Sequence, residues 1–319
     1  MSRIIAITNQ KGGVGKTTTA VNLAASIAAM KRRVLLIDLD PQGNATMGSG
    51  VNKHDLELST YDVLLGEKPL GDVIIKKLAA GYDLAPSNSD LTAAEVKLRE
   101  MSQKEKRLRA ALESVVRDYD YIFIDSPPSL NMLTLNAMVA ADSILVPMQC
   151  EYYALEGLTD LLQTIDGIRE SANPWLKLEG LVRTMFDPRN NLAVDVSAQL
   201  GQHFGDKLYR SIIPRNVRLA EAPSHGQPVL HYDKTSRGAH AYLALAVELL
   251  RREQGIVPSA QPADATPPAA AESTDAPPVT ESAAPATDNA MAVTVAAVPP
   301  VPAEENSAEQ SETPRSATG

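Results

Sequence analysis

The segment NQKGGVGKTTT, residues 9–19, constrains the fold more than any other part of the chain. It follows the short apolar run RIIAIT and precedes residues 17–33, whose apolar side chains have helical spacing and which end in a basic cluster that we expect to close the last turn. A strand that enters a glycine-rich turn and then a helix gathers unpaired backbone N–H groups at the positive end of the helix dipole. The order therefore predicts an anion-binding loop between a first strand and a first helix.

The loop nearly matches the phosphate-loop pattern G-x-x-x-x-G-K-[ST]. Gly12, Gly13 and Gly15 would let the backbone curl around phosphate oxygens, Lys16 would reach the β- and γ-phosphates, and the Thr17 hydroxyl would ligate Mg²⁺.

Two residues depart from that pattern. Gln10 occupies the position of its first glycine, and Lys11 adds a second lysine. The residues alone do not say which phosphate this extra charge serves.

Two further apolar runs, VLLIDLD (34–40) and YIFIDSPP (121–128), contain an Asp near their ends. Runs that are apolar throughout predict strands buried on both faces, as in a parallel sheet covered by helices. Further strands are expected at 82–87, 143–149, 178–186 and 209–214, and helices at 91–117, 157–171 and 239–254.

Acidic residues at the ends of these strands are candidates for the second half of a nucleotide site. Asp125 is expected to hold Mg²⁺, with the capping of the next helix as the alternative. Asp38 and Asp40 end another strand at the same sheet edge, where open α/β sheets bind ligands. Asp40 would position water and Asp38 would lie behind the metal, unless DPQGN is a plain turn.

Composition divides the chain near residue 255. Residues 255–319 contain 11 of the 22 prolines and no aromatic residue, which predicts a disordered tail. Residues 1–254 suit one large α/β domain. The tail carries nine acidic residues and one arginine, so it accounts for all but one unit of the net charge of −9. The body is near neutral and can still present a local basic face.

The single cysteine, Cys150, excludes a disulfide framework or a cysteine-built metal site within one chain, and we expect a buried thiol. The first apolar run is too short for a signal peptide, and no run reaches the roughly 18 apolar residues of a spanning helix. We therefore expect a cytoplasmic protein.

Several motifs resemble one family. KGGVGKTT resembles the deviant Walker A loop of the ParA/MinD group of ATPases, and DLDPQGNAT and IDSPPS resemble the switch I and Walker B segments of its ParA/Soj chromosome-partitioning branch. Residues 213–229 and 236–246 are similar to that branch, and the likeness spans essentially residues 1–252. The resemblance implies a P-loop NTPase with a mostly parallel, twisted sheet and helices on both faces.

The resemblance also implies the site residues. Those on the ATP triphosphate are Lys11, Gly12, Gly13, Val14, Gly15, Lys16, Thr17 and Thr18. Thr17 and Asp125 would lie at Mg²⁺ and Asp40 at the attacking water, so that Lys11, Lys16 and Asp40 are the catalytic residues. Pro214 and Asn216 are candidates for the adenine pocket, or else belong to a loop after a strand.

The resemblance also implies a role for the extra lysine, Lys11. Lys11 matches the signature lysine, which reaches the nucleotide of the partner subunit when two ATP-bound monomers form a sandwich dimer. Charge neutralisation in trans would couple ATP occupancy to homodimer formation. An ordinary surface lysine is the alternative.

Members of this branch bind DNA without sequence preference as ATP-bound dimers on the nucleoid, and a ParB-type centromere-binding protein stimulates their hydrolysis. Such binding needs basic residues aimed at phosphates. The candidates are Lys207, Arg210, Arg215, Arg218 and Arg237. Each alone is an ordinary solvated charge, and only a set joined across a dimer would make a DNA-binding surface.

Other functions remain open from sequence. A MinD-like membrane ATPase would end in a basic amphipathic helix, whereas this chain ends in a polar, acidic segment. A nitrogenase-reductase-like enzyme would need cluster-ligating cysteines. An ATP-dependent ligase of the dethiobiotin-synthase type would leave PRNVRLAEAPS unexplained, and a purely structural nucleotide-binding adaptor is also possible.

Overall fold

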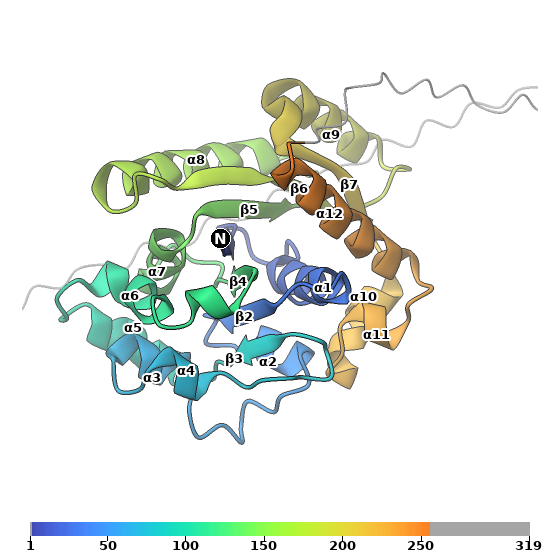
Figure 1. The fold of residues 1–319 in the computed structure, drawn as a ribbon. Coiled ribbons are helices and arrows are strands. Elements are labelled where there is room, and N and C mark those ends of the chain that lie inside the picture. Colours follow the sequence, from blue (N-terminus) through green and yellow to red (C-terminus); the bar gives the residue numbers. More distant parts are fainter. Residues whose placement is uncertain (1, 256–319) are drawn as a thin grey trace, which may run out of the picture. The chain divides into compact units, whose positions relative to one another are not determined.

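The computed structural model describes residues 2–255, and their centre is a parallel seven-stranded sheet in the order β3-β2-β4-β1-β5-β6-β7 (Figure 1). The strands are β1 (Arg3–Ile7), β2 (Val34–Asp38), β3 (Asp83–Ala85), β4 (Tyr121–Asp125), β5 (Ser143–Met148), β6 (Lys177–Phe186) and β7 (Leu208–Pro214).

Twelve α-helices and four 3₁₀ helices connect the strands within residues 2–255. The α-helices are α1 (Lys16–Ala29), α2 (Asn44–Gly48), α3 (Thr60–Leu65), α4 (Leu70–Val73), α5 (Leu91–Leu98), α6 (Arg107–Leu112), α7 (Met132–Ala140), α8 (Ala154–Ser171), α9 (Asn191–Phe204), α10 (Val217–Glu221), α11 (Val229–Tyr232) and α12 (Arg237–Glu253). The 3₁₀ helices are η1 (Lys104–Lys106), η2 (Val116–Asp118), η3 (Gly205–Lys207) and η4 (Ala222–His225).

The sheet separates two apolar cores because successive side chains of a strand point to opposite faces. On β4, Ile122 and Ile124 belong to the core that includes residues of α5 to α9, whereas Tyr121 and Phe123 belong to the core that includes α1 and α12. Figure 1 shows α1, α10, α11 and α12 on one side of the sheet and α3 to α7 on the other. The predicted parallel sheet with helices on both faces is confirmed.

The strand order reverses at β1, which pairs with β4 on one side and with β5 on the other. Because all strands are parallel, the loops that follow β1, β2, β4, β5 and β6 emerge at one edge of the sheet. Such a switch point is where open α/β sheets place their ligands. The glycine-rich loop lies at this edge.

The prediction of a single helix at 91–117 is wrong. This segment is divided into α5, η1, α6 and η2, and Gln103 between α5 and η1 has a φ of +50°. The side chain of Asn136 on α7 accepts the Leu108 N–H (3.1 Å) and donates to the Lys104 carbonyl (2.8 Å). These contacts satisfy backbone groups at the break, so a neighbouring helix fixes an interruption that helical spacing does not reveal.

Other boundaries shift by smaller amounts. Helix α1 ends at Ala29, before the basic cluster that was expected to close its last turn, and Lys31 there has a φ of +62°. Helix α12 begins at Arg237, where the Ser236 hydroxyl accepts the Ala239 N–H (3.2 Å). Neither α7 nor α9 was identified from sequence.

Cys150 is buried, as expected. The predicted tail lies outside the described residues from position 256 onward. Among residues 2–255, none of the helices has the length and apolar character needed to cross a bilayer.

Candidate nucleotide site

The loop after β1 has the backbone geometry of a phosphate cradle. Gly13 and Gly15 have φ values of +73° and +84°, a left-handed conformation that other residues adopt only with strain. Helix α1 begins at Lys16, directly after Gly15, so its unpaired N–H groups face the loop.

Three side-chain hydrogen bonds fasten the loop to neighbouring segments. Thr184 donates its hydroxyl to the Val14 carbonyl (2.7 Å), and the Gln149 amide donates to the Gly13 carbonyl (3.1 Å). Asn9 donates to the Pro147 carbonyl (2.9 Å). Thr184 and Gln149 were missed in the sequence analysis, although their place at the ends of two strand-like runs at the ligand edge was a usable signal.

The two lysines of the loop have opposite surroundings. Lys16 is only 7% exposed, and its amine donates to the Lys11 carbonyl (3.1 Å). The Lys11 side chain is 46% exposed and forms an ion pair with Glu151, whose side chain is 50% exposed. The Lys16 amine is thus enclosed, whereas the Lys11 amine points away from the loop.

Gln10, which replaces the first glycine of the common pattern, also points away from the cradle. Its side-chain amide donates to the hydroxyl of Thr164 on α8 (3.3 Å). A glycine could not make this link between the loop and α8.

Three carboxylates meet where β2 and β4 end. Asp38 and Asp125 are register partners on adjacent strands, and both are fully buried. Asp38 accepts the Thr46 N–H (2.8 Å), the Thr46 hydroxyl (2.8 Å) and the Asp40 N–H (3.1 Å). Its hydrogen-bonding capacity goes to holding the segment after β2, so its contact to a metal would be indirect.

Asp125 differs from Asp38, because neither of its carboxylate oxygens accepts a hydrogen bond of ordinary geometry from residues 2–255. Burial, followed by the charge of Asp38, raises the pKa of Asp125 well above its usual range, although the nearby Thr17 hydroxyl acts in the opposite direction. Burial also lowers the pKa of Lys16, against the attraction of Asp125 and Asp40.

This orphaned carboxylate fits a magnesium site. Mg²⁺ binds oxygen ligands and is commonly held by one or two protein groups together with waters and substrate phosphates. Asp125 offers a buried carboxylate that accepts no hydrogen bond of ordinary geometry within residues 2–255, and Thr17 offers a hydroxyl beside it. Residues 2–255 contain no cluster of three or more His, Cys, Asp or Glu side chains suited to a metal, so the remaining ligands would have to come from nucleotide and water.

Two adjoining cavities open at the loop. One of about 380 Å³ is lined by Gly12, Gly13, Gly15, Lys16, Thr17, Thr18, Asp40, Gln42, Asn44, Pro128 and Met185. The other, of about 230 Å³, is lined by Gly15, Thr18, Thr184, Met185, Ile213, Pro214, Arg215, Asn216, Leu219, Ala220 and Tyr242.

The structure therefore brings Pro214 and Asn216 beside the phosphate cradle, next to Thr18. Asn216 also caps α10, because its side chain accepts the Leu219 N–H (3.3 Å). Val14 is buried and Lys11 is directed outward, so neither lines a cavity.

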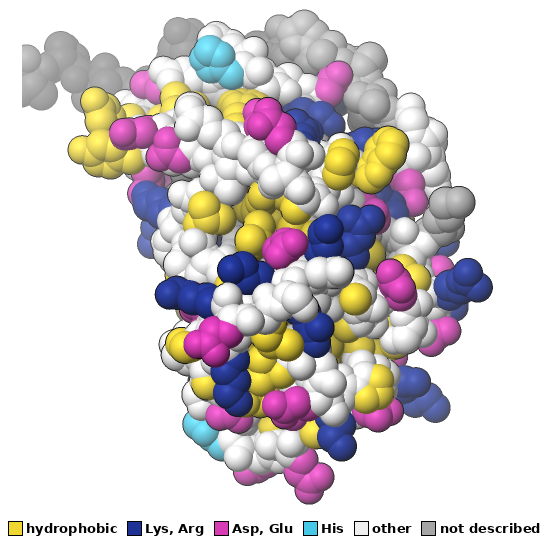
Figure 2. All heavy atoms as spheres, turned by 90° about the vertical axis from the view of Figure 1, so that its left-hand side faces the viewer, with side chains coloured by type: hydrophobic (Ala, Val, Ile, Leu, Met, Phe, Trp, Pro, Cys, Tyr) yellow, Lys and Arg dark blue, Asp and Glu magenta, His cyan; other side chains and the backbone are white. Residues whose placement is uncertain are grey.

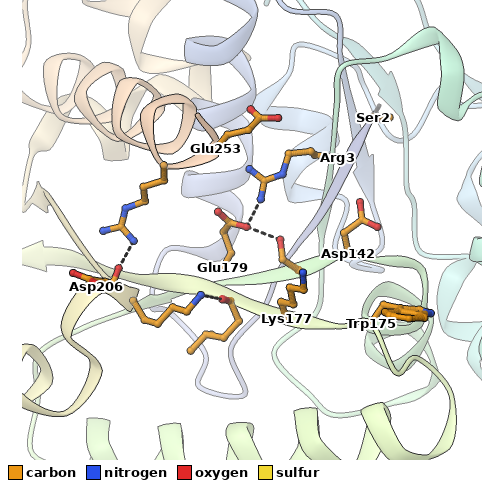
Figure 3. Close-up of a pocket in the computed structure, with 12 residues that line it drawn as sticks. Ser2, Arg3, Asp142, Trp175, Lys177, Glu179, Asp206 and Glu253 are labelled. Atoms are coloured by element: carbon orange, nitrogen blue, oxygen red, sulfur yellow. Dashed lines mark hydrogen bonds and ion pairs between the residues drawn. The ribbon is translucent and has the colours of Figure 1, made fainter. Parts of the chain in front are cut away.

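The largest cavity described, about 650 Å³, lies at the opposite edge of the sheet (Figure 3). Two of its charged groups, Arg3 and Glu179, form an ion pair with each other. Glu179 accepts hydrogen bonds from Arg3 (2.5 Å), Ser143 (2.7 Å) and Tyr209 (3.2 Å). Size alone would select this cavity, but the glycine-rich loop is at the other edge.

The five candidate DNA contacts do not form one group. Lys207 precedes β7 and lines the large cavity, whereas Arg215 follows β7, a seven-residue strand that spans about 20 Å. Arg210 lies between them in β7, where its N–H is bonded to Glu248 (2.8 Å). Lys207 and Arg215 are therefore at opposite sheet edges.

Arg215, Arg218 and Arg237 lie around the end of β7 at the nucleotide edge. The first turn of α12 is close to Asn216 there, since a Cβ on Gly238 would lie 3.1 Å from the Asn216 side-chain oxygen. Arg218 is paired with Glu221 (2.7 Å) and Asp233 (3.3 Å). Arg215 and Arg237 are exposed and form no ion pair among the described residues.

The face formed by the left-hand side of Figure 1 has a different character. Figure 2 shows Lys and Arg side chains interspersed with Asp and Glu, and hydrophobic side chains between them. This face shows no continuous basic surface.

Comparisons with known proteins agree with this geometry. A family model described as an AAA domain matches residues 2–178. The chain is 51% identical over 254 residues to the chromosome partitioning protein ParA of Caulobacter vibrioides, with coverage of 79% of this chain and 95% of that protein. It is 51% identical over 249 residues to the sporulation initiation inhibitor protein Soj of Bacillus subtilis, with coverage of 78% and 98%.

The chain belongs to the ParA/Soj family of partitioning ATPases.

A solved structure supports the same fold and site. It is named as cobyrinic acid a,c-diamide synthase of Mycobacterium smegmatis with a bound ATP analog and magnesium, and it matches with a TM-score of 0.70, 36% identity, and coverage of 80% of this chain and 96% of that one. The fold and family predicted from sequence are thus confirmed, and the ATP analog and magnesium bound by that neighbour agree with the predicted ligands, ATP and Mg²⁺.

Proposed function

We propose that this chain hydrolyses ATP to ADP and phosphate in a Mg²⁺-dependent cycle that partitions DNA. The ATP-bound form closes as a homodimer, the dimer binds DNA without sequence preference on the nucleoid, and a ParB-type partner accelerates hydrolysis and release. Residues 1–254 make up the ATPase unit. Relatives named as ParA and Soj, which align over nearly their whole lengths, support this proposal.

The described side chains can share the chemistry as follows. The loop N–H groups and Lys16 would bind the β- and γ-phosphates, and the Thr17 hydroxyl and Asp125 would hold Mg²⁺. When bound, Mg²⁺ would offset phosphate charge as hydrolysis proceeds.

We assign the orientation of the attacking water to Asp40. It lines the phosphate cavity, and its Oδ1 accepts the Gln42 N–H (2.9 Å). No hydrogen bond to its Oδ2 forms within residues 2–255, which leaves that oxygen for a water molecule.

The observation that carries the dimer proposal is the contrast between the two lysines. The enclosed Lys16 faces the chain's own cradle, whereas among residues 2–255 the only partner of the exposed Lys11 amine is the similarly exposed Glu151. Exposed ion pairs of this kind contribute about 0–1 kcal/mol, so an approaching phosphate could displace Glu151 at little cost.

Light scattering tests this role. Lys11→Ala should still bind an ATP analog but remain monomeric with ATP, because the charge that bridges to the second nucleotide is lost. Lys68→Ala is a matched control, since Lys68 is an exposed lysine in the turn between α3 and α4. Dimers of Lys11→Ala with wild-type strength would show that Lys11 does not act in trans.

Electrophoretic mobility of plain DNA tests the DNA step with ATP, with ADP and without nucleotide. Only ATP should produce a shift. Arg215→Ala and Arg237→Ala should each weaken binding and lower the salt dependence by roughly one phosphate contact per site, whereas Lys207→Ala tests the other end of β7. A shift of equal size in all nucleotide states would contradict the dimer-gated scheme.

Three other functions are less well supported. The apolar face of α12, with Tyr242, Leu245 and Leu249, is buried in the core beside α1, so α12 does not present the free amphipathic face that a membrane-binding helix needs. The 51% identity to partitioning proteins exceeds the 36% identity to the diamide synthase. Phosphate release that rises with DNA and a ParB-type partner would exclude a purely structural adaptor.

A further inference from the structure

Met185 has a backbone conformation that calls for an explanation. Four non-glycine residues among 2–255 have a positive φ, namely Lys31, Lys77, Gln103 and Met185. The first three are exposed, whereas Met185 is half-buried near the end of β6, with a φ of +49°. This conformation costs a non-glycine residue roughly 1–2 kcal/mol, and such strain concentrates at ligand sites.

The strain coincides with an irregularity in the sheet. The pairing of β6 with β7 shifts register between Arg183 and Phe186, which is the signature of a β-bulge. A bulge inserts a residue and re-aims its side chain out of the normal alternation. Methionine suits such a position, since its unbranched thioether chain tolerates backbones that β-branched residues avoid.

The bulge directs Met185 onto the phosphate loop. A Cβ built on Gly15 would lie 3.7 Å from the Met185 methyl carbon. The Gln149 amide nitrogen is 3.0 Å from the Met185 sulfur and also donates to the Gly13 carbonyl (3.1 Å). The preceding residue, Thr184, is buried and anchors the Val14 carbonyl. The end of β6 and the loop are therefore fastened together directly by Thr184 and through Gln149 at Met185.

Met185 is also shared by the two cavities at this edge. It lines both the phosphate cavity, with Lys16 and Asp40, and the adjoining cavity, with Pro214 and Asn216. Gly15 and Thr18 are shared too, but Gly15 has no side chain and Thr18 belongs to the loop itself. Met185 is the shared residue that another strand contributes.

We propose that Met185 is a nucleoside-positioning residue, whose side chain packs against the sugar and base of a bound nucleoside triphosphate at the boundary between the two cavities. This inference rests on the proposed function, in which the triphosphate occupies the loop. Met185 contacts the nucleoside and leaves the phosphates to the loop. It fixes the position of the nucleoside relative to the triphosphate. Its thioether contacts the nucleoside through dispersion and makes no hydrogen bond to it.

The test compares ATP with inorganic tripolyphosphate, each with Mg²⁺, by calorimetry on the full chain. Met185→Ala and Met185→Gly should each weaken ATP binding about tenfold, because one buried apolar side chain is lost. Tripolyphosphate affinity should change by less than about twofold, since it has no nucleoside. Met185→Leu keeps the volume and should recover most of the ATP affinity.

Comparing Met185→Ala with Met185→Gly separates the effect of losing the side chain from the effect of relieving backbone strain. Glycine relieves the left-handed backbone, so Met185→Gly should melt at the same or a higher temperature than Met185→Ala. If Met185 were only structural, ATP affinity would follow this order of stability and glycine would restore it. Nucleoside positioning requires instead that both variants lose ATP affinity, with KM for ATP rising more than kcat falls.

Gln103→Ala is the control, because Gln103 has a φ of +50° but is exposed in the break between α5 and η1. It should bind both ligands as the wild type does. An equal loss of ATP and tripolyphosphate binding in Met185→Ala would mean that the loop itself is distorted, and unchanged ATP binding would mean that the side chain is not used. Either result would overturn the inference while the wild type still bound ATP. A wild type that bound neither ligand would refute the proposed function itself.

Discussion

The buried charged groups at the two edges of the sheet differ in their hydrogen bonding. At the edge opposite the loop, Glu179 accepts three hydrogen bonds, and Arg252 donates to the Asp206 carbonyl (2.6 Å) and to Glu248 (2.7 Å). At the loop edge, the carboxylate of Asp125 is buried and accepts no hydrogen bond of ordinary geometry from the described part of the chain.

Unpaired buried charge costs free energy, so a chain keeps it only where another group compensates. At the larger cavity Glu179 is paired with Arg3, whereas the smaller cavities adjoin a buried carboxylate whose two oxygens have no hydrogen-bond partner among residues 2–255. A buried carboxylate without hydrogen bonds from the described residues therefore identifies the ligand site in this molecule better than cavity volume does.

The largest expected effect is that of replacing Asp125, and it tests the contrast between the two sheet edges. Asp125→Asn should reduce ATP hydrolysis by about 100-fold or more, because the carboxylate that would hold Mg²⁺ is lost. The same variant should raise the free energy of unfolding of the nucleotide-free protein by about 1–2 kcal/mol, since it removes an acidic group whose charged form is disfavoured by burial and by Asp38. Phosphate release and denaturant unfolding measure the two effects. A destabilised Asp125→Asn would mean that the carboxylate has a partner after all.

Asp40 offers the next effect at the same edge. Asp40→Ala should slow hydrolysis by about 10- to 100-fold while ATP binding persists, because water is no longer oriented. The ATP-bound dimer should then accumulate on DNA. Turnover at the wild-type rate, measured together with DNA retention in a spin assay, would remove Asp40 from the mechanism.

The opposite edge should respond in stability instead of activity. Glu179→Gln leaves Arg3 without its buried counter-charge and should lower the free energy of unfolding by about 2 kcal/mol. ATP affinity should be retained in the folded protein. Glu67→Gln, at an exposed position, is the control. If Glu179→Gln impaired ATP binding with little loss of stability, the division of labour between the edges would be wrong.

The smallest effect is expected outside both edges. Truncation after Gly255 should change the ATPase rate by less than about twofold, because α12 ends at Glu253 and completes the core beside α1. Steady-state hydrolysis with and without residues 256–319 measures this directly. If the truncated protein were soluble but had lost its ATPase activity, residues 256–319 would be required for ATP hydrolysis.

The sequence by itself determined the sheet class, the cradle and the order of its parts. Apolar strands, a glycine-rich turn and a helix follow directly along the chain, so local patterns suffice to predict β1, the loop and α1, and Asp125 at the end of β4. The family resemblance also implied that Pro214 and Asn216 lie near the nucleotide, and the structure brings them beside the loop.

Only the tertiary structure decided which groups are satisfied and which are not. The break between α5 and α6 depends on Asn136 of α7, the fixed loop depends on Thr184 and Gln149 from other strands, and the orientation of Met185 depends on a bulge in β6. These contacts join residues far apart in sequence, and hydrogen-bond satisfaction is a property of three-dimensional neighbours. For that reason no periodicity or motif along the chain could show that Asp38 accepts three hydrogen bonds while Asp125 accepts none of ordinary geometry from the residues that the structure describes.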